Sequence, residues 1–263
     1  MSRSITLGQY FPGNTFFHRL DPRAKLASLV VLVVGIFAVP DFRGLLVLLG
    51  LALCCLSWSR VSYRQMLKGL RPIMIIVLLT LLLHVFFTDG GLVLWRWAGF
   101  TIESDGLYLG IFTALRLVTL IFFTMLLTLT TTPLALTGAM EFFLGPLKKF
   151  RLPVSEMSMI VMIALRFIPT LMEESNRIVK AQMARGADLG EGNLLRRAKA
   201  LVPVMVPLFI SAFRRAEELS VAMEARCFRP GAPRTSLKQR HAGAGDYLSV
   251  AVSGLIVMVV VFW

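Results

Sequence analysis

Hydrophobic and polar positions divide the chain into long apolar runs separated by short polar stretches. Four apolar runs cover residues 26–39, 44–58, 72–88 and 107–132, and a fifth covers residues 247–263. A helix needs about 20 apolar residues to cross a bilayer. The first two runs fall short of this length, but a tight turn joins them, so we interpret them as a helical hairpin that crosses as a pair. The pattern therefore predicts an all-α integral membrane protein with five transmembrane helices.

Two long amphipathic helices are predicted between the fourth and fifth apolar runs. From Val154 to Ala184, apolar residues recur at spacings of three and four, and charged residues gather on the opposite face. The same plan repeats from about Leu194 to Ala225. At about 1.5 Å per residue, each helix is on the order of 45 Å long. Because only residues 187–192 connect them, the helices must run antiparallel or cross, which places their carboxyl ends far apart.

Each amphipathic helix closes on a triplet of a small residue, an arginine and a turn residue. The triplets are Ala184, Arg185 and Gly186, and Ala225, Arg226 and Cys227. A single such triplet is typical of an ordinary helix end, since arginine complements the helix dipole and glycine caps the last turn. Two triplets that each close a long amphipathic helix favour a functional interpretation. Alanine lets the tip approach a groove on a partner, and the arginine fork donates to carboxylates or carbonyls there.

Composition and charge place the chain in a membrane and predict its orientation. Of the residues, 56% are hydrophobic and 16% are charged, which excludes an ordinary soluble domain. The net charge of +13 is spread around the apolar runs, so we interpret it as a topology signal and expect no nucleic-acid binding. Residues 1–25 carry +3, and residues 133–246 carry +7. The segment 59–71 and the polar and aromatic segment 89–105 are predicted loops, and they carry +4 and −2. By the positive-inside rule, the amino terminus and the amphipathic helices are cytoplasmic, and the carboxyl terminus is outside the plasma (inner) membrane.

The sequence contains no recognisable catalytic or nucleotide-binding motif. No H-E-x-x-H pair and no G-x-x-x-x-G-K-[ST] loop occur in it. Arg116 and His84 lie inside predicted spans, and we interpret each as a hydrogen-bonded structural residue rather than a ligand. Asp21 and Arg23 have the pattern of a helix cap. We therefore expect no metal or cofactor in this chain, and energy must enter from another chain.

Several stretches of the sequence resemble the transmembrane T component (EcfT) of energy-coupling factor transporters, which are ABC-type importers of vitamins and trace metals. The resemblance rests on the two triplets and on the stretches GQYFPGN…HRLDPRAKL, LRFIPTLMEE, KAQMARGAD, RAKALVPVMVPLF and SAFRRAEELSVAMEAR. It implies transmembrane helices in residues 1–132, a cytoplasmic coupling domain in residues 133–246 and a last transmembrane helix in residues 247–263. The family pattern has glycine where Cys227 stands, so we expect a backbone less free to turn there.

The same resemblance implies the partners and the division of labour. Two cytoplasmic ATP-binding cassette ATPases would hold ATP and magnesium and would contact the two triplets. A separate membrane-embedded S component would bind the vitamin or metal. Two alternatives remain open from the residues alone. One is a membrane-bound enzyme acting on lipid-linked substrates through Arg116, His84 and the Asp21–Arg23 pair, and the other is a stand-alone channel or transporter.

Overall fold

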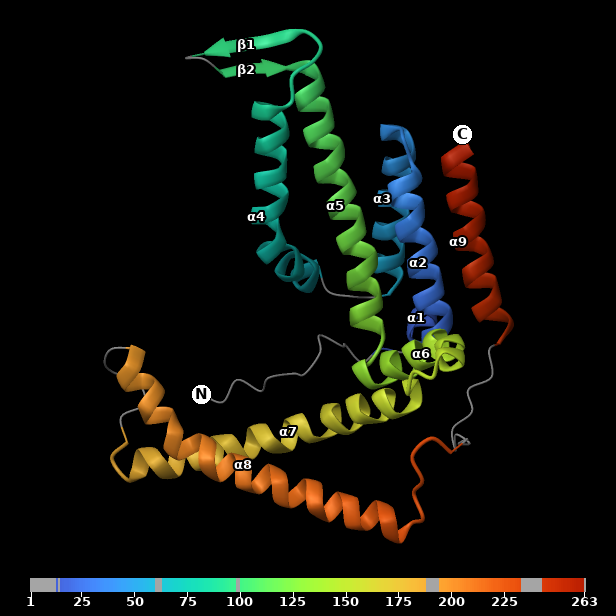
Figure 1. Cartoon of the computed structure of the whole chain (residues 1–263). Helices are drawn as coiled ribbons and strands as arrows, with labels where there is room; N and C mark the ends of the chain where they lie inside the picture. The colour runs from blue at the N-terminus through green and yellow to red at the C-terminus, as the bar shows by residue number, and fades with distance from the viewer. Residues whose placement is uncertain are drawn as a thin grey trace. The chain divides into compact units, whose positions relative to one another are not determined.

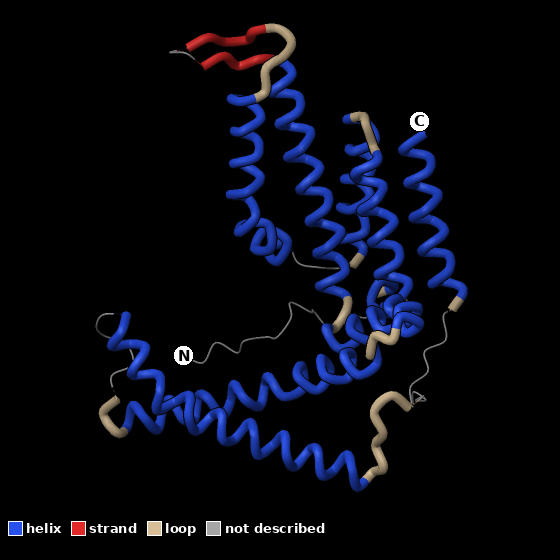
Figure 2. The backbone as a smooth tube through the Cα atoms, in the orientation of Figure 1, coloured by secondary structure: helices blue, strands red, loops and turns tan. Residues whose placement is uncertain are grey.

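A computed structural model describes the chain as helical apart from one short hairpin (Figures 1 and 2). The residues described are 13, 15–59, 63–97, 100–187, 194–232 and 243–262. They group into two compact units. We call Met1–Ala139 together with Lys238–Trp263 the bundle unit, and Met140–Leu237 the arm unit. The predicted division at residues 132/133 and 246/247 stays a prediction.

The helices follow the apolar and amphipathic runs of the sequence. Their order is α1 (Phe16–Arg19), α2 (Pro22–Ala38), α3 (Phe42–Trp58), α4 (Tyr63–Phe87), α5 (Ser104–Thr130), α6 (Pro133–Leu144), the 3₁₀ helix η1 (Gly145–Phe150), α7 (Val154–Ala184), α8 (Leu194–Ala225) and α9 (Ala244–Phe262). One difference from the expected order lies in α4. It starts at Tyr63, inside the segment predicted as a loop, and continues through Pro72. A proline inside a helix removes one hydrogen bond and bends the axis without necessarily ending the helix.

The polar and aromatic segment predicted as a loop contains a β-hairpin. Strand β1 (Val93–Trp97) pairs antiparallel with β2 (Phe100–Glu103), with Trp97 opposite Phe100. Both strands are rich in aromatic and β-branched residues, which fit a pleated surface. The carboxylate of Glu103 accepts a hydrogen bond from the backbone N–H of Gly90, which ties the hairpin to its base. The all-helical prediction is therefore correct for the helices and missed this small hairpin.

The main buried cluster of the bundle unit includes residues next to the α2–α3 turn, and a smaller cluster of Leu56, Met125 and Leu129 lies toward the other end. Ile36 of α2 and Leu45 and Leu48 of α3 are each 0% exposed, and they pack in one cluster with residues of α5 and α9. At Gly35, a Cβ atom would overlap the side chain of Val257 in α9. A small residue at this position therefore allows α2 and α9 to approach closely, as is common in helix packing within membranes.

Charged side chains tie helix ends together within the bundle unit. Asp21 is the N-cap of α2, and its carboxylate accepts a hydrogen bond from the N–H of Arg23 at 2.9 Å. The N–H of Asp21 donates to the carboxylate of Asp246, in the first turn of α9, at 2.7 Å. Lys25 Nζ donates to the carbonyl of Thr130, the last residue of α5, at 3.0 Å. The predicted cap at Asp21 is confirmed, and the cation at the end of α5 is favourable because the helix dipole is negative there.

Four helices of the described chain are long and apolar enough to cross a membrane. They cover Gly69–Phe87, Ser104–Thr130, Val154–Ala184 and Ala244–Phe262. One of the four, α7, is a helix that the sequence assigned to the coupling domain. Two predicted spans, α2 and α3, have 17 residues each and lie below the length of the four. The structure thus shows a membrane protein, and the count of five spans is not confirmed by helix length.

We predict that Asp246→Ala destabilises the bundle unit by about 1–3 kcal/mol, because it leaves two backbone donors without their acceptor. These donors are the N–H groups of Asp21 and Gly243, which the carboxylate now accepts at 2.7 and 2.8 Å. The thermal unfolding midpoint of the detergent-solubilised protein measures the effect. Asp246→Asn keeps one carbonyl oxygen and should fall in between. The matched control is Asp89→Ala at an exposed position. Equal midpoints for Asp246→Ala and wild type would contradict the prediction.

Candidate functional site

The first predicted triplet forms the capped end of α7. Arg185 is the cap residue, and Gly186 follows it in the left-handed conformation with φ of 85°. The backbone N–H of Gly186 donates to the carbonyl of Met183 at 3.0 Å, and that of Ala187 donates to the carbonyl of Gln182 at 3.0 Å. These two hydrogen bonds define a Schellman motif, which satisfies carbonyls that the helix end would otherwise leave unpaired.

The second triplet repeats this geometry at the end of α8. The N–H of Cys227 donates to the carbonyl of Glu224 at 2.9 Å, and that of Phe228 donates to the carbonyl of Met223 at 3.0 Å. Cys227 takes the left-handed conformation with φ of 56°. The cysteine therefore makes the turn that we expected it to hinder. A side chain in this conformation costs roughly 1–2 kcal/mol relative to glycine, so the turn is strained and still formed.

Both tips present their triplets to the surroundings. Ala184, Arg185, Ala225 and Arg226 are all exposed. In the described part of the chain, neither Arg185 nor Arg226 has a hydrogen-bond or ion-pair partner for its guanidinium. Each tip therefore combines a small exposed alanine with an arginine whose five donors face outward.

Contacts between α7 and α8 show that the helices run antiparallel. Gln182 of α7 lies beside Pro203 of α8, and further back along α7, Glu174 lies beside Ser211. Figure 1 shows the two helices crossing, with their carboxyl ends on opposite sides of the crossing. Arg185 lies beyond the crossing in one direction and Arg226 in the other. From the residue counts, the tips are up to roughly 40 Å apart along the helix axes.

The strongest polar contact between the two helices centres on Glu174. Its carboxylate accepts a hydrogen bond from the Ser211 hydroxyl at 2.6 Å and forms a salt bridge with Arg215 at 3.0 Å. The Ser211 hydrogen bond, together with the nearby Arg215 and Arg177 charges, lowers the pKa of Glu174 below its usual range. Glu174 is therefore ionised at neutral pH and holds α7 against α8.

Prolines within α8 create a second contact. Pro203 and Pro207 lie one turn apart inside the helix. Because Pro207 has no backbone N–H, the carbonyl of Pro203 loses its usual helical donor. The side-chain amide of Gln182 donates to this carbonyl at 3.4 Å. The prolines thus expose a backbone acceptor to α7, and this function was not predicted from the sequence.

Two further hydrogen bonds fix the base of the arm unit. The Ser158 hydroxyl in α7 donates to the Glu141 carboxylate in α6 at 2.8 Å, and the Ser158 side chain is buried. The N–H of Gly231 donates to the Glu156 carboxylate at 2.8 Å. Sequence reasoning missed both contacts, since neither follows a local motif. They position the amino end of α7 and place it beside the segment that follows Arg226.

The residues of the alternative enzyme site do not come together. Arg116 donates to the carbonyl of Val39 at 3.1 Å, and its guanidinium lies 4.6 Å from the ring centroid of Phe112. His84 Nδ1 contacts the carbonyl of Thr80, four residues earlier in α4, at 2.9 Å. Both side chains therefore make hydrogen bonds within the bundle, as predicted. Asp21 caps the opposite end of α2 from Val39, about 26 Å along that helix. Among the described residues, no three His, Cys, Asp or Glu side chains group as a metal site.

Known proteins are similar in sequence to this chain over most or all of its length. A family model described as CbiQ, cobalt transport protein, matches residues 13–237. A protein of Brevibacillus brevis named energy-coupling factor transporter transmembrane protein EcfT is 46% identical, over 100% of this chain and 99% of its own. Proteins of the same name from Clostridium kluyveri and Bacillus subtilis are 47% and 45% identical. These two alignments cover 95% and 100% of this chain, and 93% and 99% of the relatives.

We predict opposite effects of substitution at the two turn positions. Gly186→Ala should destabilise the end of α7 by about 1–2 kcal/mol, because it places a side chain at φ of 85°. Cys227→Gly should stabilise the end of α8 by a similar amount. Hydrogen–deuterium exchange of the last turn of each helix measures both effects. Gly138→Ala in α6, a helical glycine with open space around it, is the control. Slower exchange in Gly186→Ala would show that this turn is not required.

We also predict that the α7–α8 contact weakens in acid. The folded-state pKa of Glu174 is lowered, so its contribution is fully present above the unfolded value of about 4.3 and is lost as pH falls through the folded value. Hydrogen exchange around Ser211, corrected for the intrinsic pH dependence of exchange, should accelerate over this range. Glu174→Gln should remove the pH dependence. If the variant keeps the same pH dependence as wild type, another group controls the contact.

Proposed function

The chain belongs to the EcfT family of energy-coupling factor transporter transmembrane proteins, and we propose that it couples two ATPases to a separate substrate-binding membrane protein. It is the transmembrane component of such a transporter. The observation that carries the coupling proposal is the pair of matching Schellman-capped tips. Each presents an exposed arginine, and the two lie at opposite ends of one antiparallel helix pair. Such an arrangement suits two copies, or two homologues, of one partner.

Each tip would bind one cytoplasmic ATPase through its arginine. The capped turn holds Arg185 or Arg226 at the extreme end of its helix, and the preceding alanine adds little bulk. A groove lined by carboxylates or carbonyls could then accept the planar guanidinium in two parallel hydrogen bonds. Lysine carries the same charge as a single point, so it would not reproduce this contact. The groove on the ATPase would therefore distinguish arginine from lysine by the planar shape of the guanidinium as well as by its charge.

The helix pair would transmit motion between the ATPases and the S component. Glu174 and Gln182 fix the crossing, so displacement of one tip must turn the whole pair. Large apolar side chains remain exposed on both helices, among them Ile160 at 61%, Phe209 at 56% and Phe213 at 72%. An exposed apolar surface of this extent is typical of a site that contacts another protein or the membrane. We propose that the S component covers part of this face, so that movement of the helices changes its position in the membrane.

The proposed topology has five transmembrane helices: α2, α3, α4, α5 and α9. Although α2 and α3 are short, they share a buried cluster with α5 and α9 and expose apolar side chains such as Val34 and Leu46 on their outer faces. α7 instead carries five charged residues between Arg166 and Lys180. We place the amino terminus and the arm unit in the cytoplasm and the carboxyl terminus outside the plasma membrane, as the charge distribution favours.

This chain would carry no catalytic step. ATP and magnesium would bind to the ATPases, and the vitamin or trace metal would bind to the S component. The sequence supports this division, since it has no phosphate-binding loop. The residues of the alternative enzyme site also point to separate structural roles, with Arg116 bound to Val39 and His84 bound to Thr80.

We predict that the two arginines act as separate contacts with the ATPases. Arg185→Ala or Arg226→Ala should each remove one set of charge-assisted hydrogen bonds, worth roughly 1.5–3 kcal/mol. Each single variant should retain a weakened complex, and the double variant should lose the ATPases while remaining folded. Co-purification of the ATPases and substrate uptake measure these outcomes.

Two further variants sharpen this test. Arg185→Lys should be nearly as damaging as Arg185→Ala if the planar fork is required. Arg177→Ala, an exposed arginine on α7 away from the tip, is the control and should retain the ATPases. A double variant that co-purifies with the ATPases and transports as wild type does would mean that the triplets are helix caps only.

A further inference from the structure

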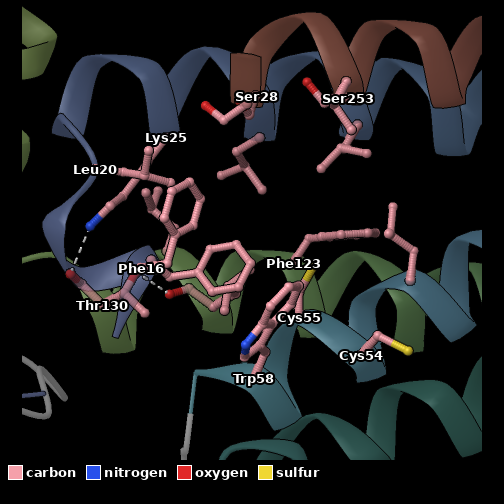
Figure 3. Close-up of a pocket in the computed structure, with 18 of the residues that line it drawn as sticks. Phe16, Leu20, Lys25, Ser28, Cys54, Cys55, Trp58, Phe123, Thr130 and Ser253 are labelled. Atoms are coloured by element: carbon pink, nitrogen blue, oxygen red, sulfur yellow. Dashed lines mark hydrogen bonds between the residues drawn. The ribbon is translucent and has the colours of Figure 1, made fainter. Parts of the chain in front are cut away.

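The bundle unit contains a cavity of about 350 Å³ between α1, α2, α3, α5 and α9 (Figure 3). Its wall includes Ser28 of α2, Trp58 of α3, Phe123 of α5 and Ser253 of α9. These residues come from the first half of α2 and α9 and from the last part of α3 and α5. The cavity therefore lies in the half of the bundle opposite the α2–α3 turn.

The cavity adjoins two buried clusters of the bundle. Ile36, Leu45 and Leu48 are completely buried in the cluster near the α2–α3 turn. Leu56, Met125 and Leu129 form a second cluster in the half that holds the cavity. Protein interiors are normally filled to the density of organic crystals, so a space of this size needs an occupant. Most of its lining is apolar, and a stable water needs two to four polar partners. An apolar occupant therefore suits the cavity best.

The rim of the cavity joins the apolar outer surface of the bundle. Among the residues that line it, Phe16 is 57% exposed, Trp58 is 76% exposed and Leu248 is 61% exposed. In the proposed topology, these residues lie at the level of the inner leaflet, where lipid tails are the abundant apolar material. A tail can thus enter sideways without crossing a polar barrier.

Exposed positive charge lies at the same end of the bundle, where the carboxylates of Asp21 and Asp246 are buried. Arg19 and Arg23 are exposed there, and Lys25 lines the cavity and donates to Thr130. Lipids of the cytoplasmic leaflet include anionic species, and each basic residue near their headgroups contributes about 1 kcal/mol of attraction. The charge pattern therefore favours an anionic lipid over a zwitterionic one.

We propose that this cavity binds one acyl chain of an anionic phospholipid from the inner leaflet, with its headgroup beside Arg19 and Arg23. The lipid would fill the space lined by α1, α2, α3, α5 and α9 and complete the packing of the bundle. This inference rests on the orientation given under the proposed function and goes beyond it, because it assigns a ligand to the T component itself.

The test uses the assembled transporter in nanodiscs of phosphatidylcholine that contain a small fraction of phosphatidylglycerol with a photoreactive diazirine in its tail. After irradiation, mass spectrometry locates the labelled peptides. We expect labelling of α3 and α5 around Cys54 and Leu126, which line the cavity. Unlabelled phosphatidylglycerol should reduce the labelling at a concentration about fivefold lower, or less, than phosphatidylcholine requires. This ratio corresponds to one contact between a basic residue and an anionic headgroup.

Two variants, one on α2 and one on α9, fill the cavity. Ser28→Phe and Ser253→Phe should each lower labelling by about tenfold, the effect of excluding a few methylene groups. Val30→Phe, on the same helix as Ser28 but 55% exposed, is the control and should label as wild type does. All three variants should still co-purify with the ATPases. Loss of lipid labelling would then be independent of the contacts made by Arg185 and Arg226. Unchanged labelling in both filling variants would overturn the proposal, as would labelling that disappears when the S component is present.

Discussion

The distance between the two arginine tips depends on the polar contact between Glu174, Ser211 and Arg215. Each long helix could otherwise slide or rotate on the other, since large apolar side chains on both, such as Ile160 and Phe213, remain exposed. A carboxylate that accepts from two donors of the opposite helix fixes both register and angle. The Gln182–Pro203 contact adds a second point eight residues along α7. With two points of contact, α7 and α8 would move together as one rigid pair instead of as two independent helices.

Polar contacts in the bundle unit are also made at helix ends, between charged side chains and backbone groups. Asp246 receives the N–H of Asp21 at the start of α2, Arg116 donates to Val39 at its end, and Lys25 donates to Thr130 at the end of α5. In a membrane, backbone groups at helix ends have few other partners, so charged side chains that reach them are especially stabilising. These residues have the types found in active sites, but their contacts hold helices together.

The sequence was informative where structure depends on neighbouring residues. The apolar period and the closing triplets of residues 154–184 and 194–225 predicted α7 and α8, and the N-cap at Asp21 predicted the start of α2. The β-hairpin was missed because its strands are only five and four residues long. The contacts of Glu174 with Ser211 and of Asp21 with Asp246 join positions 37 and 225 residues apart. No local pattern marks such pairs, and so they required the structure.

Photocrosslinking from the two tips tests the central claim most directly. A benzophenone amino acid replaces Ala184, Ala225 or both in the assembled transporter, and Val221, exposed one turn before the second tip, serves as the control position. We predict that each tip alone captures one ATPase and that both together yield a product of one T component with two ATPases. A product with at most one ATPase, or capture from Val221 as efficient as from Ala225, would contradict the two-tip mechanism.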